Sequence, residues 1–357
     1  MIGERIKQAR QAAGLALRDL ADQCGVSAMA ISKYERGEIT PSSDVLLALG
    51  KAFGVRIEYF FRDHEVELEE VEYRKHKDLP EKEKKRILAE VRNQLERWLA
   101  LEEFIPTRWS TQFQVPAGLP EKISSLEEVE TVAQELRTKW KLGLGAIPDL
   151  IDTLELHGLK VFATPYDADK MFDGLCAWAN GKPVVVVGKT WPGDRQRFTL
   201  AHELGHFVLK GRLAKNIREQ EEKACNRFAG AFLVPKASAE KLLGRDRTWI
   251  EPRELQLLKE EWGMSMIAWI LRAYDLGILN KANKSRLWDH FEANNWIKTE
   301  PGEEYRPEKP RGFEQLVYHA LAEDLIGESK AAELLGLPVA EFAAQRNMET
   351  PTNAARQ

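Results

Sequence analysis

The stretch Arg197-Phe198-Thr199-Leu200-Ala201-His202-Glu203-Leu204-Gly205-His206 contains the pattern H-E-x-x-H, with two histidines four residues apart. Four residues span slightly more than one turn of an α-helix, so His202 and His206 project from one face and can bind one metal ion together. Apolar residues surround the pattern, namely Leu200, Ala201, Leu204 and Phe207. They predict a half-buried helix. The alternative is a pair of histidines that merely pack in a core.

Imidazole ligands and one open coordination position suit Zn²⁺. Glu203 lies one step round the helix from His202, where its carboxylate can reach a water molecule instead of the metal. A zinc ion lowers the pKa of such a water to about 7, and Glu203 can take its proton as it attacks a peptide carbonyl. The pattern is therefore typical of a zinc peptidase.

A third zinc ligand is expected from residues 219–229, where several carboxylates precede an apolar stripe. Spacing alone does not separate Glu222 from Glu221 or Glu219, and each of these is alternatively a solvated surface charge. Asn226 lies one turn beyond Glu222, where it can orient a metal ligand.

A peptidase also needs a hydrogen-bond donor for the transition-state oxyanion, besides the metal. Tyr166, Arg197 and the backbone amides of residues 184–188 are candidates, and the sequence does not choose among them. Arg197 is alternatively a structural cap.

Residues 2–62 predict four short helices separated by tight turns. Glycines predict where these helices stop, at Gly14, Gly25, Gly37 and Gly54. Ser27 is a good cap for the third helix, because its hydroxyl can accept a hydrogen bond from a first-turn amide.

Within this region, residues 17–21, 24–27, 31–37 and Pro41 resemble the XRE/Cro-like helix-turn-helix. Such a motif places the N-terminal residues of its second helix in the major groove of DNA. The groove-facing residues would be Ser27, Ala28, Met29, Ser32 and Lys33. Arg18 and Ser27, near helix starts, can contact phosphates. No bidentate Arg–guanine or Asn–adenine reader is present, so the alternative is a helix-turn-helix that contacts protein.

The rest of the chain predicts a mixture of helices and strands. Residues 63–79 are charge-dense with little to bury, and an amphipathic helix follows Pro80. That helix either packs on a neighbouring domain or forms a dimer. Strands are predicted over residues 158–162 and 183–187, and helices dominate from Arg197 onward. Near the C-terminus, residues 329–339 predict helix, glycine turn, helix, which is either a small packing element or a second reader of DNA or a partner.

The chain resembles the ImmA/IrrE family of zinc-dependent peptidases, in the branch with an N-terminal XRE-type helix-turn-helix. The matching segments are 197–206, 222–229 and 233–235, with further similarity at 262–265, 272–273, 276–278, Trp296 and 300–302. The resemblance selects Glu222 as the third ligand and implies a locally thermolysin-like site. It also implies cleavage of repressors of the helix-turn-helix class. The chain departs from the family at Lys210, where many members carry a further histidine.

We therefore expect an α+β, mostly helical protein. Its expected parts are a helix-turn-helix domain (1–62), a charged linker with a connector helix (63–110), a zinc peptidase domain with a small sheet and a helical extension (111–305), and a small C-terminal helical element (311–345).

Composition narrows the expected partners and location. The 357 residues are 43% hydrophobic and 30% charged, a composition that excludes disorder of the whole chain. The net charge of −4 excludes a protein that covers nucleic acid with an overall basic surface. Residues 1–62 carry nine Lys/Arg and seven Asp/Glu, a local net charge of +2. No apolar run approaches the roughly 20 residues that cross a bilayer, and the first residues lack a signal-like stretch. Three scattered cysteines fit a reducing compartment, so we expect a cytoplasmic protein.

The leading hypothesis is a regulator that binds operator DNA and uses zinc and Glu203 to cleave a repressor partner or itself. The alternative is a non-proteolytic transcription factor or antitoxin-like regulator, with a toxin as partner, whose zinc site is structural or sensory. Under the alternative, Glu203→Gln would be silent while His202→Ala would destabilise the domain. A third hypothesis, a small-ligand sensor in the C-terminal half, is neither supported nor excluded.

Overall fold

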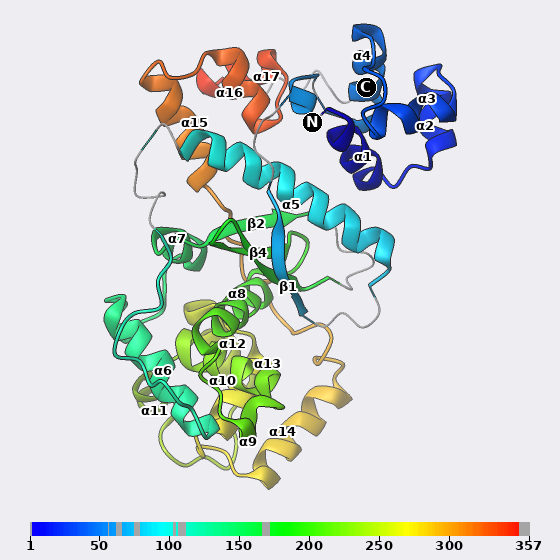
Figure 1. Ribbon diagram of the computed structural model, residues 1–357. Helices are drawn as coiled ribbons and strands as arrows, with labels where there is room; N and C mark the ends of the chain where they lie inside the picture. The colour runs from blue at the N-terminus through cyan, green and yellow to red at the C-terminus, as the bar shows by residue number, and fades with distance from the viewer. Residues whose placement is uncertain are drawn as a thin grey trace. The chain divides into compact units, whose positions relative to one another are not determined.

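The computed structural model describes residues 2–55, 57–61, 66–74, 79–102, 105, 112–165 and 172–349. The chain forms two compact units, coloured along the sequence in Figure 1. Unit 1 consists of residues 1–69, 78–111 and 311–357, and unit 2 of residues 70–77 and 112–310.

Unit 1 begins with the predicted helices. They are α1 (Ile2–Ala12), α2 (Leu17–Cys24), α3 (Ala28–Glu35) and α4 (Ser43–Phe53), followed by the 3-10 helix η1 (Ile57–Phe61). Gly25 and Gly54 end α2 and α4 in the left-handed conformation, and the Ser27 hydroxyl accepts from the Ala30 amide at the start of α3. One core joins these helices, built on Ile6, Ala9, Leu20, Ala21, Ile31, Leu46, Leu49, Tyr59 and Phe60. The expected helix-turn-helix arrangement is confirmed.

Helix α5 (Glu81–Glu102) packs against α1 within unit 1. Its apolar stripe of Ile87, Val91, Leu95 and Trp98 is buried. Arg5 of α1 donates two hydrogen bonds to the Glu96 carboxylate, at 2.5 and 2.6 Å, and both side chains are buried. These contacts confirm the interpretation of this segment as a helix that packs on its neighbours.

Three C-terminal helices complete unit 1, and the first two of them contact α5. They are α15 (Gly312–Ala322), α16 (Glu328–Leu335) and α17 (Val339–Arg346). The ring centroids of Trp98 and Phe313 lie 5.7 Å apart, and Arg97 donates to the Leu334 carbonyl at 2.6 Å. Gly336 makes the predicted turn between α16 and α17 with φ 72°. These contacts favour the packing element over a second reader of DNA.

The sheet has the strand order β1-β3-β4-β2. Its strands are β1 (Leu68–Arg74), β2 (Lys160–Thr164), β3 (Gly174–Ala179) and β4 (Lys182–Gly188). β4 pairs with β2 in parallel and with β3 antiparallel. The two predicted strands are confirmed as β2 and β4, with β2 starting two residues later than expected.

The sequence did not predict β1 or β3. β3 contains no β-branched residue, and its sequence Gly-Leu-Cys-Ala-Trp-Ala has weak strand propensity. β1 lies in the charged segment that was expected to be a linker with little to bury. Its apolar alternation breaks at Glu69-Glu70, where Glu70 takes a positive φ of 50°.

The helices of unit 2 surround one large apolar core. They are α6 (Leu126–Lys139), α7 (Leu150–Leu156), α8 (Gly193–Leu209), α9 (Lys215–Arg218), α10 (Glu221–Leu233), α11 (Lys236–Leu243), α12 (Pro252–Trp262), α13 (Met266–Asp275) and α14 (Lys281–Ala293). The four valines at 184–187 of β4 are fully buried, as expected of a central strand. Among the described helices, none is both long enough and apolar enough to cross a membrane.

Helix α8 carries the H-E-x-x-H pattern and is more buried than the sequence indicated. We expected a half-buried helix, but every residue from Thr199 to Leu209 is buried. The prediction was wrong because α8 is covered by β3 and β4 as well as by α10 and α7. Local apolar periodicity shows only that one face is buried, and distant segments cover the polar face as well.

Residues 300–308 fix the N-terminal half of α8. The Gly193 amide donates to the Tyr305 carbonyl at 2.8 Å, and a Cβ at Gly193 would lie 2.3 Å from the Arg306 oxygen. Glu308 forms an ion pair with Arg197 and accepts from the first amides of α7, those of Leu150 and Ile151, at 2.8 and 2.9 Å. Burial raises the pKa of the Glu308 carboxyl, an effect that the neighbouring Arg197 guanidinium opposes.

The Arg5–Glu96 pair generates the first prediction. Glu96→Ala should lower the free energy of unfolding of unit 1 by about 3 kcal/mol, because it leaves a buried guanidinium without its carboxylate. The measurement is hydrogen exchange of the α1 amides in the full chain, with exposed Glu4→Ala as the control. Equal protection of α1 in the two variants would show that this pair does not hold α1 to α5.

Candidate functional site

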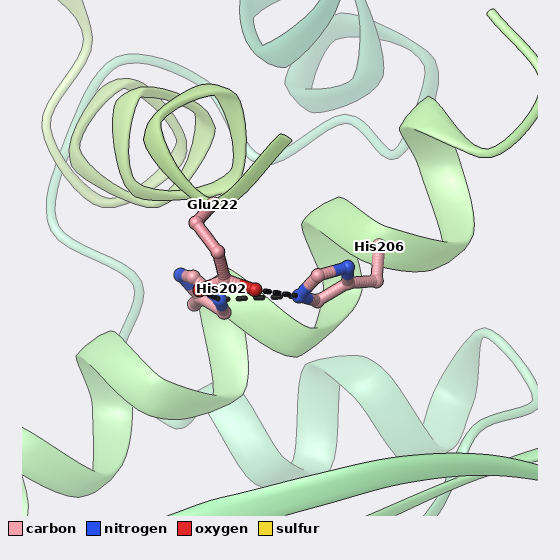
Figure 2. Close-up of side chains that lie close together, drawn as sticks. All are labelled: His202, His206 and Glu222. Carbon is pink, nitrogen blue, oxygen red and sulfur yellow. Dashed lines mark hydrogen bonds and ion pairs between the residues drawn. The ribbon is translucent and has the colours of Figure 1, made fainter. Parts of the chain in front are cut away.

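Three side chains from two helices of unit 2 meet in one cluster (Figure 2). His202 and His206 come from α8, and Glu222 comes from the first turn of α10. The two Nε2 atoms lie 3.2 Å apart. Glu222 places Oε2 3.4 Å from His202 Nε2 and Oε1 3.6 Å from His206 Nε2. Of the three carboxylates that spacing left open, Glu222 is the one in this cluster.

The cluster has the donors and spacing that a metal ion requires. Around tetrahedral zinc, with Zn–N bonds of about 2.0–2.1 Å, two ligand nitrogens stand about 3.3 Å apart. The observed separation of 3.2 Å between the two Nε2 atoms matches that edge. Two imidazoles and a carboxylate are also the donor types that zinc accepts while keeping one position open. The three residues therefore can hold a metal ion, and their chemistry fits zinc.

Polar groups on the outer side of the imidazoles direct their inner nitrogens toward the cluster. Asn226 Oδ1 lies 2.9 Å from His202 Nδ1. An amide oxygen only accepts, so Nδ1 carries the proton and the Nε2 lone pair remains available for a metal. On His206 the Glu221 carboxylate lies 3.5 Å from Nδ1 and favours the same tautomer.

Glu203 is buried at the adjoining position of α8, beside the two histidines but outside the cluster. Its Oε1 lies against the first residue of β3, because a Cβ built on Gly174 would come within 3.8 Å of it. That same Cβ would lie 2.6 Å from Thr199 Cγ2, so a glycine is needed for β3 to approach α8 this closely. Glu222, by contrast, has a side chain that is 66% exposed, so solvent reaches the cluster from the α10 side.

The structure narrows the candidates for an oxyanion donor. Arg197 is buried and is held by Glu308 and by the Ile147 carbonyl, which favours the structural alternative for this residue. The amides of residues 184–188 belong to β4, which is paired on both sides. Tyr166 lies outside the described residues.

The predicted DNA-contacting residues lie at the start of α2 and along α3. Arg18 is exposed on the first turn of α2, and Met29 is 69% exposed on α3. Ser27 is exposed, although its hydroxyl caps α3, and Ala28, Ser32 and Lys33 are half-buried. The structure thus brings these residues together on one helix-turn-helix.

One further cation belongs to this surface. Arg36 donates to the Ser32 hydroxyl at 2.5 Å and pairs with Glu38 while its side chain remains exposed. The sequence analysis did not select Arg36. Its position four residues after Ser32, one helical turn along, was the available signal.

Comparisons with known proteins agree with this two-part organisation. Residues 154–274 match the peptidase M78 family model, described as the IrrE N-terminal-like domain, and residues 6–60 match a helix-turn-helix family model. No solved structure gives a significant match.

Two curated regulators each match a short part of the chain. One is an uncharacterized transcriptional regulator in the ATPase CF(0) region of Rhodospirillum rubrum, 44% identical over 64 residues, or 18% of this chain and 59% of that protein. The other is the HTH-type transcriptional regulator ImmR of Bacillus subtilis, 34% identical over 65 residues, or 18% of this chain and 51% of that protein. The matches thus span between one half and three fifths of the length of these relatives.

The chain joins an XRE-type helix-turn-helix domain to an IrrE-like domain of a peptidase family. This combination confirms the family resemblance that the motifs indicated. The IrrE-like match includes the histidine pair, Glu203 and Glu222, all of which lie between residues 154 and 274.

The hydrogen bond from Asn226 generates the second prediction. Asn226→Ala should weaken zinc binding about 10- to 100-fold, because His202 loses the group that fixes its tautomer and ring orientation. Competition with a chromophoric chelator measures the affinity, and Lys223→Ala on the exposed face of α10 is the control. If both variants bind zinc equally well, Asn226 does not support the site.

Proposed function

We propose that this protein is a DNA-binding transcriptional regulator whose IrrE-like domain is a zinc-dependent peptidase. The observation that carries the proposal is the cluster of His202, His206 and Glu222, with nitrogens at a zinc-ligand spacing and Glu203 buried beside it. A zinc site that is only structural has no need of a carboxylate at this position. The fused helix-turn-helix and the two matched regulators support the regulatory role.

Each residue has a distinct part in this proposal. His202, His206 and Glu222 would hold the ion, with Asn226 orienting His202. Zinc bound there would act as a Lewis acid and lower the pKa of water to about 7. Glu203 takes a proton from the attacking water and returns it to the leaving amine, as a general base and then a general acid. Burial of Glu203 beside the cluster keeps its carboxylate at a fixed place for both transfers.

The proposed substrate is a repressor of the helix-turn-helix class or the chain itself. The support for the repressor is the resemblance of the domain to IrrE-like peptidases. A homodimer remains part of the proposal, since paired domains read paired half-sites. The apolar stripe of α5 is buried within unit 1, so a dimer would use another surface.

Glu203→Gln gives the third prediction. It should lower the rate of cleavage about 10²- to 10⁴-fold, because the general base is lost, and leave zinc affinity unchanged. The assay incubates the zinc-loaded chain with itself and with a purified XRE-class repressor from the same genome, and follows fragments by mass spectrometry. Glu219→Gln is a matched carboxylate-to-amide control, since Glu219 is exposed and does not belong to the cluster.

Two outcomes would contradict proteolysis. One is an intact repressor and an intact chain after incubation with zinc-loaded protein. The other is regulation in cells that Glu203→Gln leaves unchanged while His202→Ala destabilises the protein. The second outcome would establish the structural or sensory zinc site of an antitoxin-like regulator.

The α3 surface gives the fourth prediction. Lys33→Ala should weaken binding to double-stranded DNA and reduce the slope of log affinity against log salt by about 1, because one phosphate contact is lost. The probe is a DNA duplex selected by the full chain from a random library, and the readout is fluorescence anisotropy at several salt concentrations. Lys51→Ala, exposed on α4, is the control. An unchanged slope would place Lys33 outside the DNA interface.

A further inference from the structure

Strand β3 lies between β1 and β4 and runs along α8. The strand side chains alternate, so Gly174, Cys176 and Trp178 share the face that meets this helix. Gly174 lies at Thr199 and Glu203, and the Trp178 ring centroid is 5.3 Å from that of Phe207. β3 therefore follows α8 from the proposed general base to the turn after His206.

Without β1, the edge of β3 would present unpaired N–H and C=O groups to solvent. An extended peptide adds to such an edge by main-chain hydrogen bonds, with alternate side chains in contact with the neighbouring surface. Because β3 begins beside Glu203, a strand added there would run past the proposed catalytic carboxylate. In this structure β1 takes that place in the sheet.

An ion pair links β1 to the end of α8. Glu70 of β1 pairs with Lys210, the residue that ends α8, and Lys210 Nζ lies 5.9 Å from the Trp178 ring centroid. Glu70 and Lys210 have side chains about half exposed, and such pairs add little to stability. Glu70 also holds a positive φ of 50°, which is unfavourable for a residue other than glycine. Neither the ion pair nor the backbone conformation of Glu70 therefore adds much to the stability of β1 in the sheet.

We propose that β1 is an internal occupant of the β3 edge along which a substrate strand pairs, and that Lys210 selects a carboxylate side chain in the strand that lies there. This inference rests on the proposed peptidase function and specifies its substrate as an extended, acidic segment. A substrate must displace β1 before it reaches Glu203, so the segment after the helix-turn-helix domain limits access to the site.

The test measures peptide binding instead of hydrolysis. The full chain carries Glu203→Gln, and the probe is a fluorescein-labelled peptide with the sequence of residues 66–74. The double variant Val71→Pro/Glu72→Pro weakens the pairing of β1 with β3. Successive N–H groups of a strand point to opposite sides, so one of the two N–H groups that the prolines remove faces β3, whichever way the strands are aligned. This variant should bind the peptide about tenfold more tightly than the chain with intact β1, since the competing strand is gone.

Lys210 is tested in the same proline variant. Lys210→Ala should weaken peptide binding about threefold, as expected for the loss of one solvent-exposed charge pair. A peptide with lysine in place of Glu70 should bind poorly, and Lys210→Glu should restore its binding. The control is Glu69→Ala in the full chain, which removes an exposed carboxylate beside Glu70 and should leave peptide binding unchanged.

Exchange of the β3 amides provides a second readout that needs no peptide. Single Glu70→Lys, at an exposed position, should speed exchange over residues 174–179 without unfolding the protein. Equal peptide affinity with and without the prolines, or exchange unchanged by Glu70→Lys, would overturn the inference. If the peptide binds as expected while the zinc-loaded protein cleaves neither a repressor nor itself, that pair of results would support the inference and refute only the proposed peptidase activity.

Discussion

Helix α8 is buried along most of its length, yet it carries an arginine, an aspartate, a glutamate and two histidines on its buried faces. A buried polar group is costly unless another group satisfies it, so the surroundings of α8 must supply partners. Glu308 pairs with Arg197, Lys259 approaches Asp194 at 3.3 Å, and Asn226 binds His202. These partners come from segments far apart in the sequence. The buried polar groups of α8 therefore bring together several distant segments of unit 2.

The same requirement gives the site its asymmetry. The two histidines are fixed by packing and by groups behind their rings, whereas Glu222 stands on an exposed turn of α10. A rigid pair and one accessible carboxylate leave a side of the cluster open to solvent. Proton transfer by Glu203 would need such rigid placement, because small displacements of catalytic groups lower the reaction rate strongly.

The sequence was most informative for features that depend only on the spacing of nearby residues. His202 and His206 follow from the helical period, and the turns at Gly25, Gly54 and Gly336 follow from the left-handed conformation that glycine tolerates. Choosing Glu222 over its neighbours required the family resemblance, because three carboxylates lie within four residues of the sequence.

Features that depend on distant partners escaped prediction. β1 is charged, and only its place beside β3 makes it a strand. Glu300 and Glu308 lie in a Pro/Gly-rich stretch whose local pattern indicates a loop, yet Glu300 accepts from the first amides of α13 and pairs with Lys259. Such contacts join residues tens of positions apart, and no periodicity encodes them.

The segment 300–308 also bears on how the peptidase domain is delimited. The family match ends at residue 274, but the carboxylates that hold the N-terminal half of α8 and the first turns of α7 and α13 lie some thirty residues beyond it. An expression fragment cut at the end of the matched region would retain all three proposed metal ligands and lose Glu300 and Glu308. If such a fragment were inactive, the cause could be the loss of the contacts that Glu300 and Glu308 make with α7, α8 and α13. A fragment that keeps these contacts extends to about Pro310, where unit 2 ends.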